Sequence, residues 1–304
     1  MVSGDTVLIF ACDEAFVPLA KGLVLSIQSQ ALPAEFSLKM IDIGCSNETL
    51  QWMESRQVSI SKFNYGDFSA RAPRTKMKNY QQAQLCRPFL PKLFPGYEVY
   101  VWCDSDIWIQ NIESLRLYRD IAKSNKKIVP ISPLVDVSYN YFYQDCTEFV
   151  TYSKHWFENA YGRTVAEGYG SRAVLSSGIF AMHTENDLWG LWASELDAIF
   201  QRDFASHFSV HLAEQTAFNY LLYAHQRFCP VDAMHNYNCH VGRIGRDEFG
   251  DVVISDAPHR KLGVVHLTYS SKMMGDYLDQ GLLYEKAQYL SPQEIEKLRS
   301  LNHY

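Results

Sequence analysis

The segment spanning residues 100–109 constrains the fold of this chain most strongly. It reads Tyr-Val-Trp-Cys-Asp-Ser-Asp-Ile-Trp-Ile, so two carboxylates, Asp104 and Asp106, interrupt an apolar run. The interior of a strand has no reason to hold two acids, because an unpaired buried carboxylate is very costly. At a strand end, a divalent cation can neutralise the pair, and Mg²⁺ and Mn²⁺ bind carboxylates together with substrate phosphates. The alternative is a turn or helix cap, in which either aspartate accepts hydrogen bonds from backbone amides.

Composition narrows the class of protein. The 304 residues suffice for one large α/β domain or two small ones, and 47% hydrophobic with 20% charged residues is ordinary for a folded soluble protein. A formal charge of −6 argues against a nucleic-acid binder, which usually has a basic face. No apolar run reaches the roughly 18 residues of a membrane span, and the first residues do not resemble a signal peptide. We therefore expect a cytoplasmic protein, either free or peripheral to a membrane.

The cysteines agree with that expectation. There are seven, widely scattered and without a C-x-x-C pair. An odd, dispersed set is typical of reduced thiols in a cytosolic protein. A zinc site assembled from distant Cys and His residues remains the alternative.

The N-terminal part of the chain alternates apolar runs with helical patterns. The pattern predicts strands over 6–11, 37–43, 58–63 and 98–103, and helices over 16–29, 48–56 and 81–93. This order is typical of half of a nucleotide-binding α/β sheet, where ligands collect outside the carboxyl ends of the strands. Asp13 follows the first strand and Asp104 and Asp106 follow a later one, so these acids are expected to face one crevice.

The remainder is less regular. We expect strands over 128–130, 179–183 and 262–267, and helices over 188–200 and 212–223. The sequence Ser291-Pro292-Gln293-Glu294 predicts the start of a C-terminal helix, with Ser as the N-cap and Pro in the first turn. No repeat, low-complexity tract or linker is evident, so a single continuous domain fits best.

Several short motifs follow one another in a recognisable order. Arg87 lies in a segment, 86–95, that contains Leu-Pro and precedes the strand and Asp104-Ser105-Asp106. Two further motifs lie near the N-terminus, at residues 10–16 and 20–26. Three others come later in the chain: Ser176-Ser177-Gly178 before a predicted strand, the segment Glu-Gln-Thr-Ala-Phe-Asn at residues 214–219, and His266 followed six residues later by Lys272. Together they resemble glycosyltransferase family eight, the family of glycogenin and of bacterial lipopolysaccharide galactosyl- and glucosyltransferases. The resemblance covers about residues 6–272.

The resemblance implies an α/β fold of the GT-A type: one domain with a mixed, mostly parallel central sheet flanked by helices. An aromatic helical insertion and a C-terminal helix would complete it. The nucleotide-binding half would cover about 1–110, the acceptor side about 111–275 and a helical tail about 276–304. The implied reaction is metal-dependent transfer of a hexose, with retention, from a nucleotide sugar such as UDP-glucose or UDP-galactose to a glycan or other hydroxyl acceptor.

The resemblance also assigns roles. Asp104, Asp106 and His266 would hold Mn²⁺ or Mg²⁺ against the diphosphate, where the cation stabilises the charge of the leaving group. The implied catalytic residues are Arg87, Glu214, Gln215 and Lys272. The implied donor-binding residues are Ala11, Asp13, Phe16, Arg87, Asp104, Ser105, Ser177, Gly178 and Lys272. Among these, Asp13 would accept a hydrogen bond from a base such as uracil, and Phe16 or a neighbour would pack on its ring.

Each assignment has a structural alternative. His266 could simply be hydrogen-bonded in the core, and Arg87 could form an ion pair on a helix surface. Asp13 could cap the following helix, Ser177-Gly178 could be a plain turn, and Glu214 with Gln215 could be an exposed helix edge. The aromatic segment between Tyr139 and Tyr161, which includes Tyr152, His155 and Trp156, could be a sugar acceptor platform or could fill a secondary core.

The chain departs from the family pattern at several positions. Ala15 and Ser176 stand where the family has Asn, and Glu214 and Thr216 replace two aspartates. Tyr269 replaces a glycine of the phosphate loop, and Met273-Met274 replaces Pro-Trp. These changes indicate a divergent member whose substrates can differ.

Three alternative functions each require different residues. Nucleotidylyl transfer needs a Gly-rich basic loop after the first strand, and residues 12–16 contain neither glycine nor a basic residue. An inverting transferase would need a carboxylate base, and Glu214 could serve. The main alternative is a nucleotide-sugar-binding or scaffold protein that kept the fold and lost turnover.

Overall fold

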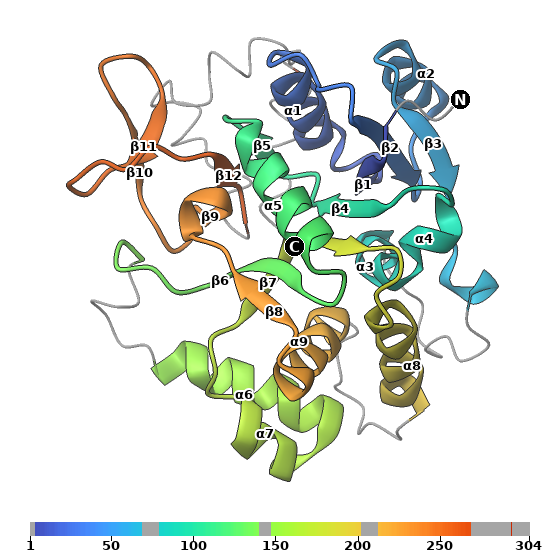
Figure 1. Cartoon of the computed structure of the whole chain (residues 1–304), viewed down its shortest axis with the longest axis vertical. Coiled ribbons are helices and arrows are strands. Elements are labelled where there is room, and N and C mark those ends of the chain that lie inside the picture. Colours follow the sequence, from blue (N-terminus) through green and yellow to red (C-terminus); the bar gives the residue numbers. More distant parts are fainter. Residues whose placement is uncertain (1–3, 69–78, 140–146, 202–211, 269–292, 294–304) are drawn as a thin grey trace.

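A seven-stranded mixed sheet forms the centre of the molecule (Figure 1). The computed structural model describes residues 4–68, 79–139, 147–201, 212–268 and 293. The strand order is β3-β2-β1-β4-β7-β6-β8. The strands are β1 (Thr6–Cys12), β2 (Phe36–Asp42), β3 (Ser59–Lys62), β4 (Val99–Cys103), β6 (Val129–Pro133), β7 (Leu175–His183) and β8 (Phe228–Pro230). Strand β7 runs antiparallel to β4 and β6, and the other pairs are parallel, which confirms the expected mixed, mostly parallel sheet.

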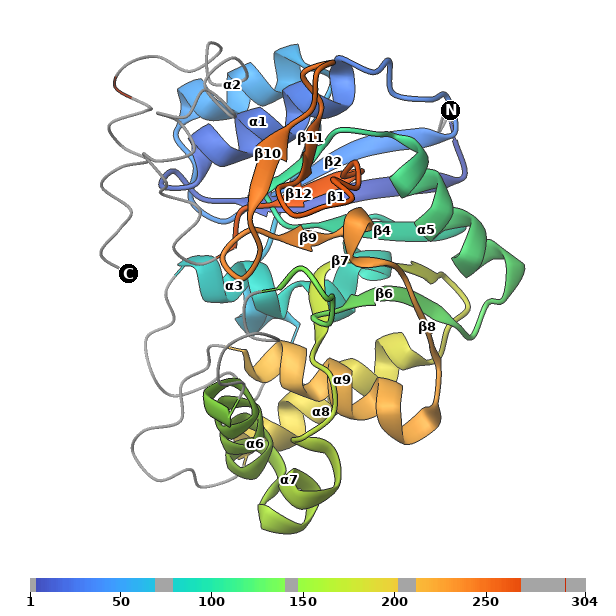
Figure 2. The ribbon, with the colours of Figure 1, turned by 90° about the vertical axis from the view of Figure 1, so that its left-hand side faces the viewer.

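Helices cover both faces of this sheet (Figure 2). One face packs on α1 (Val17–Gln28), α2 (Asn47–Ser55) and α5 (Glu113–Ser124). The other packs on α3 (Asn79–Leu85), α4 (Leu90–Leu93), α8 (Leu188–Gln201) and α9 (Ala213–His225), with α6 (Thr147–Tyr161) and α7 (Arg163–Tyr169) beyond α9. Strand β1 is buried at every position, since a central parallel strand is covered on both sides.

A smaller sheet lies beside the carboxyl end of β4. It pairs β5 (Ile107–Ile109) with β12 (Val264–His266), and β12 with β9 (Tyr237–Asn238). A hairpin of β10 (Ile244–Arg246) and β11 (Val252–Ile254) adjoins it. These strands of two or three residues are too short for periodicity to reveal, and the sequence did not predict β5, β9, β10 or β11. Their pairing brings His266 opposite Ile107, one residue after Asp106.

The helix predicted over 81–93 is wrong as a single element. The chain forms α3, then the 3₁₀ turn η2 (Arg87–Phe89), then α4. Pro88 and Pro91 each lack the N–H that a continuous helix requires, so each lies at the start of a new segment. The break sets Arg87 at the junction.

The plain turn considered for Ser177-Gly178 is also wrong. Both residues lie inside β7, which begins at Leu175 rather than near Ile179. The backbone N–H of Asp104 donates to the carbonyl of Gly178 at 2.8 Å, so β7 continues alongside the end of β4. This places Ser177 and Gly178 next to the two aspartates.

The aromatic region supports the secondary-core interpretation where it is described. Tyr161 of α6 packs on Tyr220 of α9 with ring centroids 4.5 Å apart, and Tyr169 of α7 packs on the same ring at 5.4 Å. Tyr152, by contrast, is 52% exposed. Residues 140–146 lie outside the described part, as does the C-terminal helix predicted from Ser291.

Within the described ranges, none of the helices has both the length and the apolar character needed to cross a membrane. The cysteines there carry free thiols: Cys12, Cys45, Cys86, Cys103, Cys229 and Cys239.

Substitution of Trp192 tests whether the packing of α8 against α9 stabilises the fold. The fully buried ring of Trp192 stacks on Phe218 at 3.9 Å with an interplanar angle of 7°, and its Nε1 donates to the carbonyl of Glu214 at 3.1 Å. We expect Trp192→Ala to lower the free energy of unfolding in urea by about 3–5 kcal/mol, because a large cavity remains between α8 and α9. Trp52→Ala, at a half-exposed ring on α2, is the control and should cost clearly less. Equal losses would contradict the packing role.

Candidate metal and donor site

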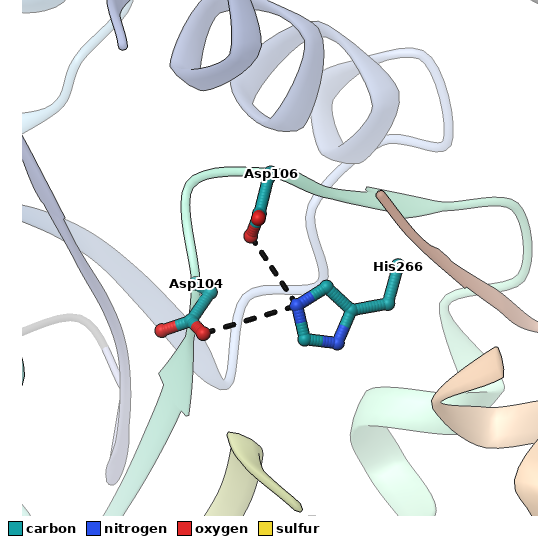
Figure 3. Close-up of side chains that lie close together, drawn as sticks. All are labelled: Asp104, Asp106 and His266. Carbon is teal, nitrogen blue, oxygen red and sulfur yellow. Dashed lines mark ion pairs between the residues drawn. The ribbon is translucent and has the colours of Figure 1, made fainter. Parts of the chain in front are cut away.

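Asp104, Asp106 and His266 converge beside the carboxyl end of β4 (Figure 3). One ligand atom from each lies within 4.8 Å of the other two. The Nε2 atom of His266 is 3.3 Å from Oδ1 of Asp106 and 3.8 Å from Oδ2 of Asp104. Two ligands at right angles, each about 2.1 Å from a small divalent cation, are about 3 Å apart. Two carboxylates and an imidazole at this spacing therefore fit such a cation.

Backbone hydrogen bonds hold this cluster from both sides. Ile107 N–H donates to the carbonyl of Asp104 at 3.1 Å, which closes the turn between β4 and β5. Leu267 N–H donates to the carbonyl of Asp106 at 3.0 Å, which continues the pairing of β12 with β5. The aspartates come from one turn and the histidine from a strand that lies far along the sequence.

Gly178 makes room for the histidine. A Cβ atom placed on Gly178 would lie 2.2 Å from Cε1 and 3.0 Å from Nδ1 of His266. The imidazole, which is only 3% exposed, therefore packs directly on the backbone of β7. Glycine is required here because of this close approach.

The two oxygens of Asp104 have different surroundings. Oδ1 accepts hydrogen bonds from Nη2 of Arg87 at 2.5 Å and from Nε1 of Trp102 at 2.7 Å. Oδ2 faces His266. The side chain remains 27% exposed, so one oxygen is fixed by the protein while the carboxylate keeps access to a ligand.

Arg87 joins Asp104 to a second carboxylate. Its Nη1 donates to Oε2 of Glu214 at 2.5 Å and to Oγ of Ser177 at 2.9 Å, and its guanidinium lies 5.0 Å from the ring of Trp102. Arg87 is 4% exposed and Glu214 is completely buried. The alternatives of a surface ion pair and of an exposed helix edge are therefore wrong for these two residues.

Burial and ion pairing have opposite effects on the pKa values of Arg87 and Glu214. Burial raises the pKa of Glu214 to about 7, although the nearby guanidinium of Arg87 opposes that rise. Burial lowers the pKa of Arg87, but the carboxylates of Asp104 and Glu214 outweigh this effect, so its pKa is raised overall. Arg87 therefore stays charged, while Glu214 can exchange a proton near neutral pH.

Helix α9 is anchored to β7 by two side chains one helical turn apart. Oε1 of Gln215 accepts from both N–H and Oγ of Ser177, each at 3.1 Å. Asn219 pairs with the backbone of Leu175, accepting from its N–H at 2.7 Å and donating to its carbonyl at 2.8 Å. These bonds place Glu214 and Gln215 beside Ser177.

The other predicted donor residues lie at the ends of β1 and β4, which are adjacent parallel strands. Oδ1 of Asp13 accepts from the N–H groups of Ala15 and Phe16, each at 3.1 Å, and closes the turn before α1. The N-cap residue of α1 is Phe16, without a side-chain capping bond, so the interpretation of Asp13 as the helix cap is wrong. The side chain of Ala11 is buried in the core, Ser105 is 8% exposed, and Phe16 is half-buried. Lys272 and Tyr269 lie outside the described residues.

Sequence reasoning missed two residues that touch this cluster. Trp102 was read only as part of an apolar strand, although its indole N–H meets Asp104. Asn236 was not singled out, and its Oδ1 lies 2.8 Å from Nδ1 of His266. No signal in the sequence pairs Asn236 with His266, because 30 positions separate them.

No known protein family matches the chain, and no curated protein matches it in sequence. Solved structures do match it. An active-site mutant of LgtC superposes with a TM-score of 0.61 at 12% identity, over 96% of this chain and 99% of that one. Galactosyltransferase LgtC with donor and acceptor sugar analogues gives 0.58 at 11% identity, over the same shares of the two chains. WbbM, a bifunctional glycosyltransferase, gives 0.62 at 15% identity over 98% of this chain, which spans 51% of WbbM. At such low identities the likeness shows the fold alone, and that fold is the GT-A type.

The buried carboxyl of Glu214 predicts an unusual pH dependence. Its pKa is about 7 when folded and near 4.5 when unfolded, so between these values the folded chain holds more protons. Its contribution to stability is complete below pH ~4.5 and is lost as the pH rises to ~7. We therefore expect the free energy of unfolding of the wild type, measured in urea, to fall by up to about 3 kcal/mol relative to that of Glu214→Gln as the pH rises from ~4.5 to ~7.

Glu35 is the control for that measurement. Backbone hydrogen bonding, together with Arg116 and Arg119, lowers the pKa of Glu35, so Glu35→Gln should change the pH dependence with the opposite sign. A wild type and a Glu214→Gln variant that stay parallel from pH 4.5 to 7 would contradict the burial argument.

The contact between Gly178 and His266 gives a second prediction. In Gly178→Ala the new methyl group must displace the imidazole, so we expect Mn²⁺ binding, measured by calorimetry, to weaken by at least about 10-fold. The extra volume should also cost about 1–3 kcal/mol of stability. Gly190→Ala on α8 is the matched control, because a Cβ there has no neighbour within 4 Å. Unchanged Mn²⁺ affinity in Gly178→Ala would remove His266 from the metal site.

Proposed function

We propose that this chain is a metal-dependent retaining glycosyltransferase. It moves a hexose from a nucleotide sugar, UDP-glucose or UDP-galactose, to a hydroxyl of a glycan or another acceptor. The observation that carries the proposal is the convergence of Asp104, Asp106 and His266 at the edge of a GT-A sheet where strand carboxyl ends meet. The retaining chemistry and the hexose rest on the resemblance of the sequence motifs to glycosyltransferase family eight.

The charges around the cluster support a cation. Asp104 and Glu214 share one guanidinium, Arg87, and Asp106 adds a third carboxylate beside His266, so the carboxylates outnumber the guanidinium among these four groups. A divalent cation balances that excess. Mn²⁺ or Mg²⁺ held by Asp104, Asp106 and His266 supplies Lewis-acid stabilisation of the leaving diphosphate.

The side chains of this protein then orient the donor. Arg87 and Trp102 hold Oδ1 of Asp104, which leaves Oδ2 directed at the metal position. Ser177 hydrogen-bonds to the amide oxygen of Gln215 and not to its amide nitrogen. That half-buried side chain can offer two N–H donors to a polar ligand such as a sugar hydroxyl. Lys272 would add a positive charge near the phosphates.

The alternative is binding of a nucleotide sugar without turnover. The observation in its favour is the complete burial of Glu214, because a carboxylate without exposed surface has little access to a substrate. The same burial argues against Glu214 as the base of an inverting reaction. Binding and turnover are therefore tested separately.

The first experiment titrates the purified chain with a panel of nucleotide sugars, with and without Mn²⁺. We expect a Mn²⁺-dependent rise in Tm with one donor, together with slow hydrolysis of that donor. Asp106→Asn should abolish both, because it removes a ligand charge while keeping the shape of the side chain. Asp120→Asn, at an exposed aspartate on α5, is the matched control and should change neither.

The outcomes separate the two functions. A shift without hydrolysis, and without transfer to any glycan acceptor, would favour the binding protein. No shift with any donor in the presence of Mn²⁺ would contradict both. Hydrolysis that persists in Asp106→Asn would place the reaction away from this cluster.

A further inference from the structure

We propose that Asn236 is a positioning residue that sets the tautomer of His266. This inference rests on the metal site of the proposed function. Oδ1 of Asn236 lies 2.8 Å from Nδ1 of His266, and the two residues are 0% and 3% exposed. An amide oxygen only accepts hydrogen bonds, so Nδ1 carries the hydrogen and a neutral imidazole keeps its lone pair on Nε2. That is the nitrogen that faces Asp104 and Asp106.

The aspartates alone would favour the opposite tautomer. Nε2 is 3.3 Å from a carboxylate oxygen of Asp106, and the negative charge of the carboxylates attracts a hydrogen on Nε2. Such a hydrogen would block the lone pair that a metal needs. A neutral imidazole has only one N–H, and Nδ1 is the ring nitrogen that is hydrogen-bonded, to Oδ1 of Asn236, which holds the hydrogen there.

The backbone holds Asn236 in place independently of the metal. Asn236 follows the 3₁₀ turn η4 (Ala233–His235), and its N–H donates to the carbonyl of Ala233 at 2.9 Å. Its own carbonyl accepts from Nδ2 of Asn238 at 2.9 Å. Asn238 in β9 pairs with His266 in β12, so both partners of the Asn236–His266 bond belong to one rigid unit.

The amide nitrogen of Asn236 destabilises the fold, so the asparagine is not explained by stability alone. In the described part of the chain, its Nδ2 is buried without a hydrogen-bond partner. Burying such a donor without a partner is unfavourable, because the donor loses its hydrogen bonds to water. An apolar side chain of similar size would avoid that cost, so the acceptor oxygen is the feature that the site uses.

The test compares Asn236→Leu, which removes the acceptor, with Asn236→Asp, which keeps an acceptor at the same place. Calorimetric titration of the intact chain with Mn²⁺, without donor, gives the Kd. We expect Asn236→Leu to raise the Kd roughly 10- to 100-fold and Asn236→Asp to keep it at or below the wild-type value. Asn186→Leu is the matched control, since Asn186 is 3% exposed, has a buried Nδ2 without a partner among the described residues and bonds the N–H of Leu188.

Nitrogen-15 NMR of the His266 ring gives a readout that needs neither metal nor variant. The proposal requires hydrogen on Nδ1 in the metal-free wild type, and hydrogen on Nε2 would overturn it. A folded Asn236→Leu with wild-type Mn²⁺ affinity would overturn it as well. If the wild type binds no Mn²⁺, the proposed function fails, and the tautomer observed by NMR still decides the role of Asn236.

Discussion

The rest of the site depends on the hydrogen bonds and ion pairs of one buried guanidinium, that of Arg87. It joins Asp104 at the end of β4, Ser177 in β7 and Glu214 at the start of α9. Removing one partner from such a buried network costs about 3–5 kcal/mol, because the remaining charge has no compensation. The three elements are therefore fixed relative to one another by charge, and the metal-facing side of Asp104 is fixed with them.

In two of the three candidate metal ligands, the atoms that face away from the cation position are already held by other residues. Asp104 is held by Arg87 and Trp102, and His266 is held by Asn236 and packs on Gly178. Ligands oriented in this way lose little conformational entropy when a cation binds, so little of the binding free energy is offset by ordering them. The same arrangement explains why the immediate surroundings of the site include an asparagine that makes no contact with a donor in the proposed mechanism.

Sequence reasoning succeeded where the signal is local. The alternation of apolar runs and helical patterns over residues 6–103 predicted the first strands and helices to within a few residues, because a sheet covered on both faces needs continuous apolar strands. It failed at Pro88 and Pro91, where the missing N–H groups break one predicted helix into three segments. It also started the strand at Ile179 and left a plain turn at Ser177-Gly178 as an alternative, because a serine and a glycine have a turn propensity that the strand pairing of β7 overrides.

The sequence by itself determined the class of fold and the identity of the acidic pair, since an apolar run that ends in Asp104-Ser105-Asp106 is costly to bury unless something neutralises it. Only the tertiary structure decided that Glu214 is buried against Arg87 and that Asn236 meets His266. The physical reason is the range of these contacts. They depend on pairing between strands of two or three residues and on burial of charge, and neither leaves a periodic pattern in the chain.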